Sequence, residues 1–122
     1  FSDYNVFARM LYDTGKINEI EFKSYKLWFH HFLEDFPVFF YIYIRTDFKK
    51  CYERVFERSR RGESPITEKY LETCEKYHED WLQNEFYILT FDGNRDATAH
   101  SEYLETLKEM VNYRITKTES IP

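Results

Sequence analysis

Hydrophobic residues near the start of the chain recur at the spacing of a helix. Val6 and Met10 stand four positions apart, so they fall on one face of a helix over residues 3–13. Gly15 follows, and glycine is favoured just past the end of a helix because it accepts backbone angles that other residues avoid. The pattern therefore predicts a short helix that stops near Gly15.

A longer amphipathic pattern, "NEIEFKSYKLWFHHFLED", covers residues 18–35. Asn18 is followed three residues later by Glu21, the arrangement of a reciprocal cap at a helix start. The bulky residues that repeat along the segment are Ile20, Tyr25, Trp28, Phe29 and Phe32. We expect a helix whose aromatic residues either belong to the core or form a face for another chain.

Two runs in the second part of the chain have the character of strands. "VFFYIYIR" at 38–45 is apolar on both faces, as expected for a buried strand of a parallel sheet, and "FYILTFD" at 86–92 is similar. Helices are predicted over 48–59 after a cap at Thr46 or Asp47, over 67–83 after Thr67, and over 99–112. The order strand, helix, helix, strand, helix indicates an α/β fold, which binds ligands at the carboxyl ends of its strands.

Composition narrows the function classes. The 122 residues are 43% hydrophobic and 20% aromatic, which suits one folded domain. A formal charge of -5 argues against a general nucleic-acid binder, and no apolar run is long enough to cross a bilayer. Cys51 and Cys74 lack the spacing of a metal site and fit a reducing, cytoplasmic location. Because the first residue is Phe1 and not methionine, we expect a fragment.

The segment "RVFERSRRGES" at 54–64 concentrates arginine in an otherwise acidic chain. Arg54 and Arg58 share a helix face, whereas Arg60 and Arg61 fall where glycine and proline turn the helix into a loop. Guanidinium groups bind phosphate oxygens through paired hydrogen bonds, so this loop suits a polyphosphate. A solvated helix face, in which the arginines pair with neighbouring glutamates, explains the same spacing.

Four segments within residues 1–97 form a further pattern: "SDYNVFARMLYDTG", "YIYIRT…CYERVFERSRRGE", "YLE…HEDWL" and "ILTFDGNRD". In this order and spacing they resemble the deoxynucleoside kinases, the family of deoxycytidine, deoxyguanosine, deoxyadenosine and mitochondrial-type thymidine kinases. The resemblance implies the C-terminal part of a P-loop kinase fold, an α/β fold with a parallel sheet flanked by helices. The chain has no G-x-x-x-x-G-K-[ST] loop. We therefore expect a partial kinase domain over 1–113 and a frayed C-terminal tail over 114–122.

The resemblance assigns the arginine-rich segment to a lid that closes over ATP. Arg58 and Arg60 would hold phosphate oxygens during transfer, and Arg54 would lie against the adenine. Glu63 matches the lid glutamate that accepts a hydrogen bond from the sugar 3'-hydroxyl, although a surface counter-ion is the alternative reading. The family's Glu-Arg-Ser motif lies on the nucleoside side, so the same triplet at 57–59 belongs to the lid instead.

At the start of the chain, the resemblance implies a base site. Asp3 matches an aspartate that reads the base edge, and Phe7 matches a phenylalanine that stacks on the base, with plain helix core as the alternative for Phe7. Tyr4 and Asn5 replace the Arg-Tyr pair of the animal enzymes, so the preferred base stays open.

The loop "DGNRDA" after the second strand matches a donor-side loop of the family. Arg95 and Asp96 are the expected ATP contacts there, with Asn94 beside them. Ala97 stands where many relatives place a phenylalanine against adenine. His78, in "YHEDWL", is expected to orient structure and not to bind a ligand.

The function implied is transfer of the ATP γ-phosphoryl group to the 5'-hydroxyl of a deoxynucleoside, for nucleotide salvage. Mg²⁺ would be held mainly outside this chain, the intact enzyme would be a homodimer, and the chain alone would be inactive. No nucleic acid or membrane partner is expected. The alternatives are another P-loop kinase, such as a thymidylate kinase, and a non-catalytic helical interaction module.

Overall fold

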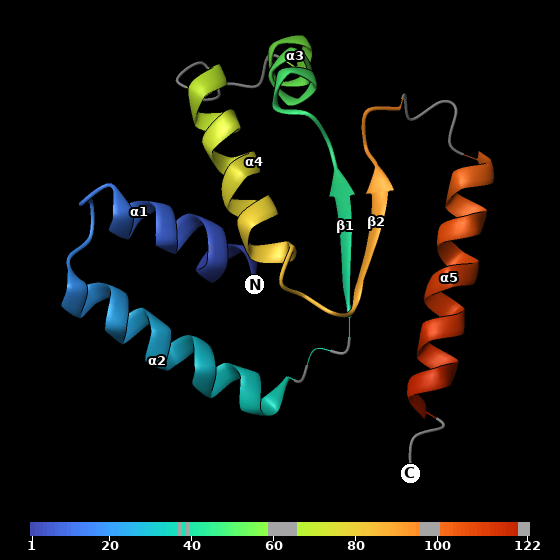
Figure 1. Cartoon of the computed structure of the whole chain (residues 1–122), viewed down its shortest axis with the longest axis horizontal. Coiled ribbons are helices and arrows are strands. Elements are labelled where there is room, and N and C mark those ends of the chain that lie inside the picture. Colours follow the sequence, from blue (N-terminus) through green and yellow to red (C-terminus); the bar gives the residue numbers. More distant parts are fainter. Residues whose placement is uncertain (37, 39, 59–65, 96–100, 120–122) are drawn as a thin grey trace.

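The protein is described by a computed structural model that covers residues 1–36, 38, 40–58, 66–95 and 101–119 (Figure 1). Its elements are the π-helix η1 (Asp3–Ala8), then α1 (Arg9–Asp13), α2 (Glu19–Asp35), β1 (Tyr41–Arg45), α3 (Phe48–Arg58), α4 (Glu68–Leu82), β2 (Ile88–Asp92) and α5 (Ser101–Glu119). The predicted α/β order is confirmed, from β1 through α5.

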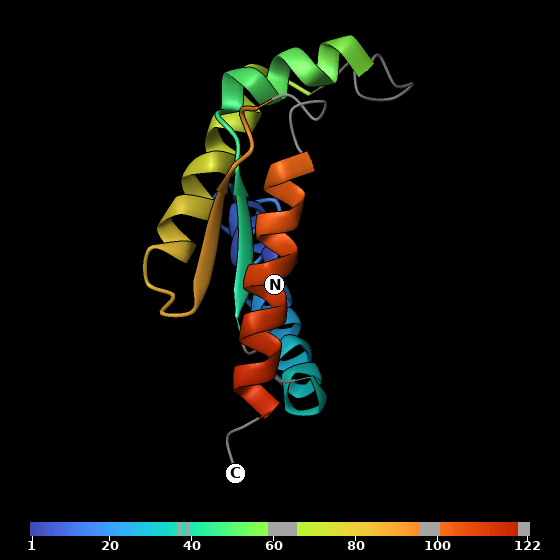
Figure 2. The same ribbon diagram turned by 90° about the vertical axis from the view of Figure 1, so that its right-hand side faces the viewer.

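The two strands form a parallel pair. Tyr41 lies opposite Ile88 and Arg45 opposite Asp92, so both strands end at the same edge. The strands lie between α4 and α5 in two perpendicular views, and α3 crosses above their carboxyl ends (Figures 1 and 2). The expected parallel sheet flanked by helices is therefore present.

Local capping explains where three helices begin. The Asn18 side chain accepts from the Glu21 N–H at 3.0 Å, and the Glu21 carboxylate accepts from the Asn18 N–H at 2.7 Å. Thr67 caps α4 through its hydroxyl oxygen, which accepts a backbone N–H at 3.1 Å. Of the two candidates for α3, Asp47 provides the cap, because its carboxylate accepts the N–H two residues later at 2.9 Å.

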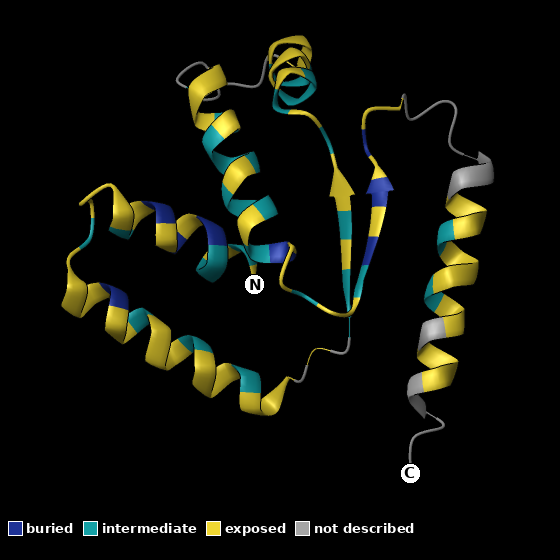
Figure 3. Cartoon of the chain, in the orientation of Figure 1, coloured by how far each residue is buried: buried dark blue, intermediate teal, exposed yellow. Residues whose placement is uncertain are grey.

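The core lies where η1, α1, α2 and α4 meet and along β2. Its buried hydrophobic residues are Val6, Ala8, Met10, Phe22, Leu82, Leu89 and Phe91 (Figure 3). The expectation that the first strand is buried on both faces is wrong for this chain. Ile42 and Ile44 are 44% and 60% exposed, because α4 packs against the face that carries Tyr41 and Tyr43.

Helix α2 divides its aromatic residues between two faces. Phe22 is buried and the rings of Tyr25 and Phe29 are half-buried beneath Tyr4, which stacks on all three. The predicted residues that stay on the exposed side are Ile20, Trp28 and Phe32, at 77%, 64% and 55% exposure. The single apolar face read from the sequence is thus two faces, of which one is covered.

Helix α5 continues to Glu119, so residues 114–119 are helical and not the frayed segment that we expected. The division of the chain at residue 113 stays a prediction. Among the described helices, none has both the length and the apolar character needed to cross a membrane.

Candidate functional site at the carboxyl edge of the sheet

The ends of the two strands are held together by main-chain and side-chain hydrogen bonds. The Gly93 N–H donates to the Arg45 carbonyl oxygen at 2.7 Å. The Asn94 side-chain oxygen accepts the Asp47 N–H at 2.9 Å, and the Asn94 N–H donates to Asp92 Oδ1 at 3.0 Å. These bonds fix the turn after β2 against the start of α3.

Gly93 permits this close approach because it has no side chain. The residue is buried. A Cβ atom at this position would lie 2.8 Å from Ile44 Cγ2 and 3.1 Å from the Arg45 carbonyl oxygen, and closer still to the Thr46 hydroxyl. Any larger residue would push the two strand ends apart.

Arg54 joins α3 to the same turn. Its Nη1 donates to the Gly93 carbonyl oxygen at 2.8 Å, and its Nη2 donates to the Arg95 carbonyl oxygen at 3.1 Å. Glu53, a candidate counter-ion in the solvated-face interpretation, pairs instead with Lys50 at 2.9 Å. Helix α3, which carries Arg54 and Arg58 and is called the arginine helix below, is therefore anchored at the edge where α/β sheets bind ligands.

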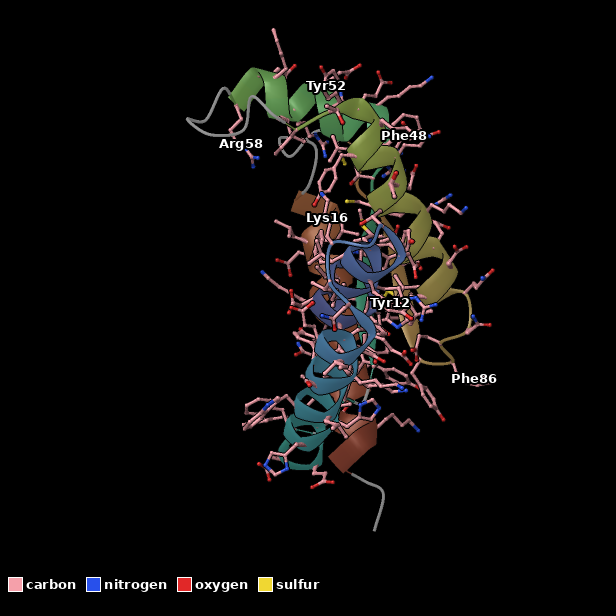
Figure 4. The ribbon with its side chains drawn as sticks, turned by 90° about the vertical axis from the view of Figure 1, so that its left-hand side faces the viewer. Tyr12, Lys16, Phe48, Tyr52, Arg58 and Phe86 are labelled. Carbon is pink, nitrogen blue, oxygen red and sulfur yellow. The ribbon has the colours of Figure 1, made fainter. Side chains whose placement is uncertain are left out.

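The other predicted donor-side residues are placed only in part. Arg58 is exposed at the end of α3 farthest from Phe48 (Figure 4). Arg95 makes an ion pair with Asp92, with Nε 3.6 Å from Oδ2. The remaining predicted residues, Arg60, Glu63 and Asp96, lie outside the described part of the chain. Their roles stay predictions.

A hollow of about 300 Å³ opens beside this turn. Its lining residues are Arg45, Asp47, Glu75, Thr90, Phe91, Asp92 and Asn94. Glu79 holds the lining residue Arg45 in place. Its Oε1 accepts hydrogen bonds from Arg45 Nε at 2.7 Å and from the Tyr43 hydroxyl at 3.2 Å. Burial, reinforced by Glu79, raises the pKa of Tyr43 to about 12.

Acidic groups cluster on the α4 side of the hollow. Burial raises the pKa of Glu75, and the nearby carboxylates of Asp47 and Glu79 raise it further. This network around Arg45 leaves no local signal in the sequence, because it joins residues 34 positions apart. Asp47 alone carried a signal, as a helix cap.

The residues expected at the base site share the π-helix η1. π-Helices are rare in proteins, and those that occur are often found at functional sites. The Asp3 carboxylate accepts from the hydroxyl of Tyr25 on α2. Burial, with this hydrogen bond, raises the pKa of Tyr25 to about 12. Phe7 is 38% exposed and meets the His78 ring on α4 edge to face, with centroids 6.3 Å apart.

The two groups of predicted site residues lie along one helix. Helix α4 contacts both η1 and α3, with α3 nearer its start and η1 nearer its end (Figure 1).

The chain is similar to known proteins of one family. A profile of the deoxynucleoside kinase family matches residues 1–117. Deoxycytidine kinase 2 of Gallus gallus is 34% identical over 100 residues, which cover 79% of this chain and 38% of that protein. Deoxycytidine kinase 1 of Xenopus laevis is 33% identical over 126 residues, covering 91% and 48%. The chain thus spans less than half the length of these relatives.

A solved structure shares the fold. It is the deoxyadenosine kinase from M. mycoides with bound dCTP, which superposes with a TM-score of 0.71 at 24% identity and covers 85% of this chain and 58% of its own. The family match over residues 1–117 also decides between the two enzyme families considered from the sequence. The chain belongs to the deoxynucleoside kinase family.

Proposed function

We propose that the protein containing this chain transfers the γ-phosphoryl group of ATP to the 5'-hydroxyl of a deoxynucleoside. The observation that carries the proposal is the pair of hydrogen bonds from Arg54 to the carbonyl oxygens of Gly93 and Arg95. They anchor the arginine helix at the carboxyl edge of the sheet. The family relationship over residues 1–117 supports the same reaction.

The bonding of Arg54 suits a contact with adenine. Both carbonyl bonds use N–H groups at the edge of the guanidinium plane. The flat faces of the group are not used by these bonds, and guanidinium faces stack on aromatic rings. Arg54 would therefore hold the turn and lie against the base of ATP at the same time.

Arg58 and Arg60 are proposed to hold phosphate oxygens. Charge spreads over these oxygens during phosphoryl transfer, so positively charged donors already in place lower the barrier. Arg58 ends the helix that Arg54 anchors, which supports a position near the donor. Within the described residues, no cluster of three or more His, Cys, Asp or Glu side chains could hold a metal ion. The ligands of Mg²⁺ are proposed to lie mainly outside this chain.

The nucleoside is proposed to contact Asp3 and Phe7 through its base and Glu63 through its 3'-hydroxyl. A lid carboxylate that binds the sugar would couple lid closure to a correctly seated substrate. The relatives named above are kinases of deoxycytidine and deoxyadenosine. Both bases carry an exocyclic amino group, which could donate a hydrogen bond to the Asp3 carboxylate.

Two further properties are proposed for the intact protein. The exposed face of α2, defined by Ile20, Leu27, Trp28 and Phe32, is a candidate surface for a homodimer. Cys51 and Cys74 are free thiols, which supports a cytoplasmic location.

The reaction is tested by incubating the full-length protein with ATP and each of the four deoxynucleosides. We expect a 5'-monophosphate and one ADP per turnover with at least one of them. Arg58→Ala should lower kcat by roughly 100-fold, whereas Lys49→Ala, on the exposed side of α3, should leave kcat unchanged. Absence of any monophosphate, or equal effects of the two variants, would count against the proposal.

A further inference from the structure

Three aromatic rings form a row that crosses three elements. Phe7 on η1 meets His78 on α4 at an interplanar angle of 82°, with the ring centroids 6.3 Å apart. His78 also lies parallel to Tyr43 on β1, at 4° and 6.2 Å. The imidazole therefore contacts both the helix that carries the proposed base site and the sheet.

The orientation of His78 is fixed by more than this stacking. Its Nδ1 is 2.7 Å from the Cys74 carbonyl oxygen, and because a carbonyl only accepts, Nδ1 carries the hydrogen. Tyr43 is itself held, since its hydroxyl donates to Glu79 at 3.2 Å. A half-buried ring with a hydrogen bond at one edge and a stacked partner on one face has little freedom to turn.

Phe7, in contrast, keeps part of its surface open. The residue is 38% exposed, and an edge-to-face contact covers at most one face of its ring. Part of Phe7 is therefore available to a flat ligand. The contact with His78 restricts how the ring can turn.

We propose that His78 is a positioning residue for the nucleoside: it holds the Phe7 ring in the orientation in which a base stacks on it. The inference rests on the proposed function, which assigns the base to Phe7. It adds that the imidazole, through Phe7, contributes to the affinity for the nucleoside without touching the base or the phosphates.

Steady-state kinetics of the full-length protein test this role. An edge-to-face ring pair contributes modestly, so His78→Ala should raise the KM for the deoxynucleoside by roughly 2- to 10-fold. The KM for ATP and kcat should stay unchanged, because neither the lid nor the turn after β2 is touched. His78→Phe keeps a ring without the Nδ1 hydrogen bond and should recover most of the affinity.

A double-mutant cycle separates positioning from simple packing. In a Phe7→Ala background, His78→Ala should add no further increase in KM, since the ring that it orients is gone. His31→Ala, on the exposed side of α2, is the matched control and should change neither constant. Calorimetric titration of the nucleoside without ATP should reproduce the same ratios in Kd.

Several outcomes overturn the inference. One is a loss of kcat with every substrate and no change in nucleoside KM, which indicates a purely structural residue. Another is an equal increase in KM with and without Phe7, and a third is no effect of His78→Ala on the nucleoside KM. If Phe7→Ala raises the nucleoside KM and His78 fails these tests, the positioning role falls and the proposed function stands. If the wild-type protein phosphorylates no deoxynucleoside, both fall.

Discussion

Arg54 donates to the Gly93 carbonyl oxygen across 2.8 Å, and this bond joins two segments that are 39 residues apart in the chain. With the second bond to Arg95, it ties the arginine helix to the turn that follows β2. A shift of either segment would move the other, so the two sides of the proposed ATP site are mechanically connected.

Replacing Arg54 by lysine should disconnect them. Lysine keeps the charge but cannot donate to two carbonyl oxygens from one rigid plane. We expect a loss of about 1–3 kcal/mol in the free energy of unfolding, measured by urea denaturation, and a higher KM for ATP. Lys49→Ala is the control, and a similar loss in that variant would show that the Arg54 bonds do not matter.

Gly93→Ala should damage the same turn by crowding. The added methyl group would clash with Ile44, Thr46 and the Arg45 carbonyl oxygen. This clash should lower the free energy of unfolding by about 1–3 kcal/mol. Gly15→Ala is a useful comparison. Gly15 has a φ of 71° with nothing within 4 Å, so its cost of about 1–2 kcal/mol would come from backbone strain alone.

Thermal unfolding and the KM for ATP distinguish the two glycines. Both variants should have a lower melting temperature. Only Gly93→Ala should raise the KM for ATP, because Gly15 is remote from the sheet edge. An unchanged melting temperature for Gly93→Ala would mean that the turn relaxes without cost.

Glu63→Ala should impair use of the nucleoside far more than use of ATP. A hydrogen bond from a neutral hydroxyl to a charged acceptor contributes enough that its loss should lower kcat/KM for the deoxynucleoside roughly 10- to 100-fold. Glu63→Gln keeps an acceptor oxygen and should show a smaller loss. If Lys49→Ala has as large an effect as Glu63→Ala, the sugar-binding role is wrong.

Stability should fall as the solution becomes strongly alkaline. The pKa of Tyr43 is raised from 10.0 to about 12 in the folded protein, chiefly by burial and then by Glu79. Between these values the unfolded chain has lost the phenolic proton while the folded protein keeps it, so the free energy of unfolding decreases with pH. The stabilisation is complete below pH 10 and is lost as the pH approaches 12.

Urea denaturation at pH 9 and pH 11 measures this slope. Tyr43→Phe should reduce it, because the residue can no longer ionise. An identical slope in the Tyr43 variant would contradict the assignment.

The chain of 122 residues, expressed alone, should neither bind ATP tightly nor transfer phosphate. Its sequence has no glycine-rich loop of the P-loop type, which holds the β- and γ-phosphates. Calorimetric titration with ATP and an assay with deoxyadenosine and deoxycytidine check this. Appreciable phosphorylation by the isolated chain would refute it.

Short-range rules predicted much of this protein correctly. The caps at Asn18 and Thr67 depend on side chains that bond three residues ahead, and the alternation of strand and helix depends on local periodicity. The family resemblance also followed from segments that are contiguous in the chain. These features can be predicted from the sequence because both partners of each interaction lie within one or two helical turns.

Other features depend on how distant segments pack. The bonds of Arg54 and the close approach of Gly93 to Ile44 exist because β1 and β2 pair in one parallel register. The row from Phe7 to Tyr43 exists because α4 contacts both η1 and β1. The exposed side of α2 and the open face of β1 likewise follow from which helix covers which surface. Periodicity reports that a face is apolar, but only the packing of the folded chain establishes what, if anything, covers it.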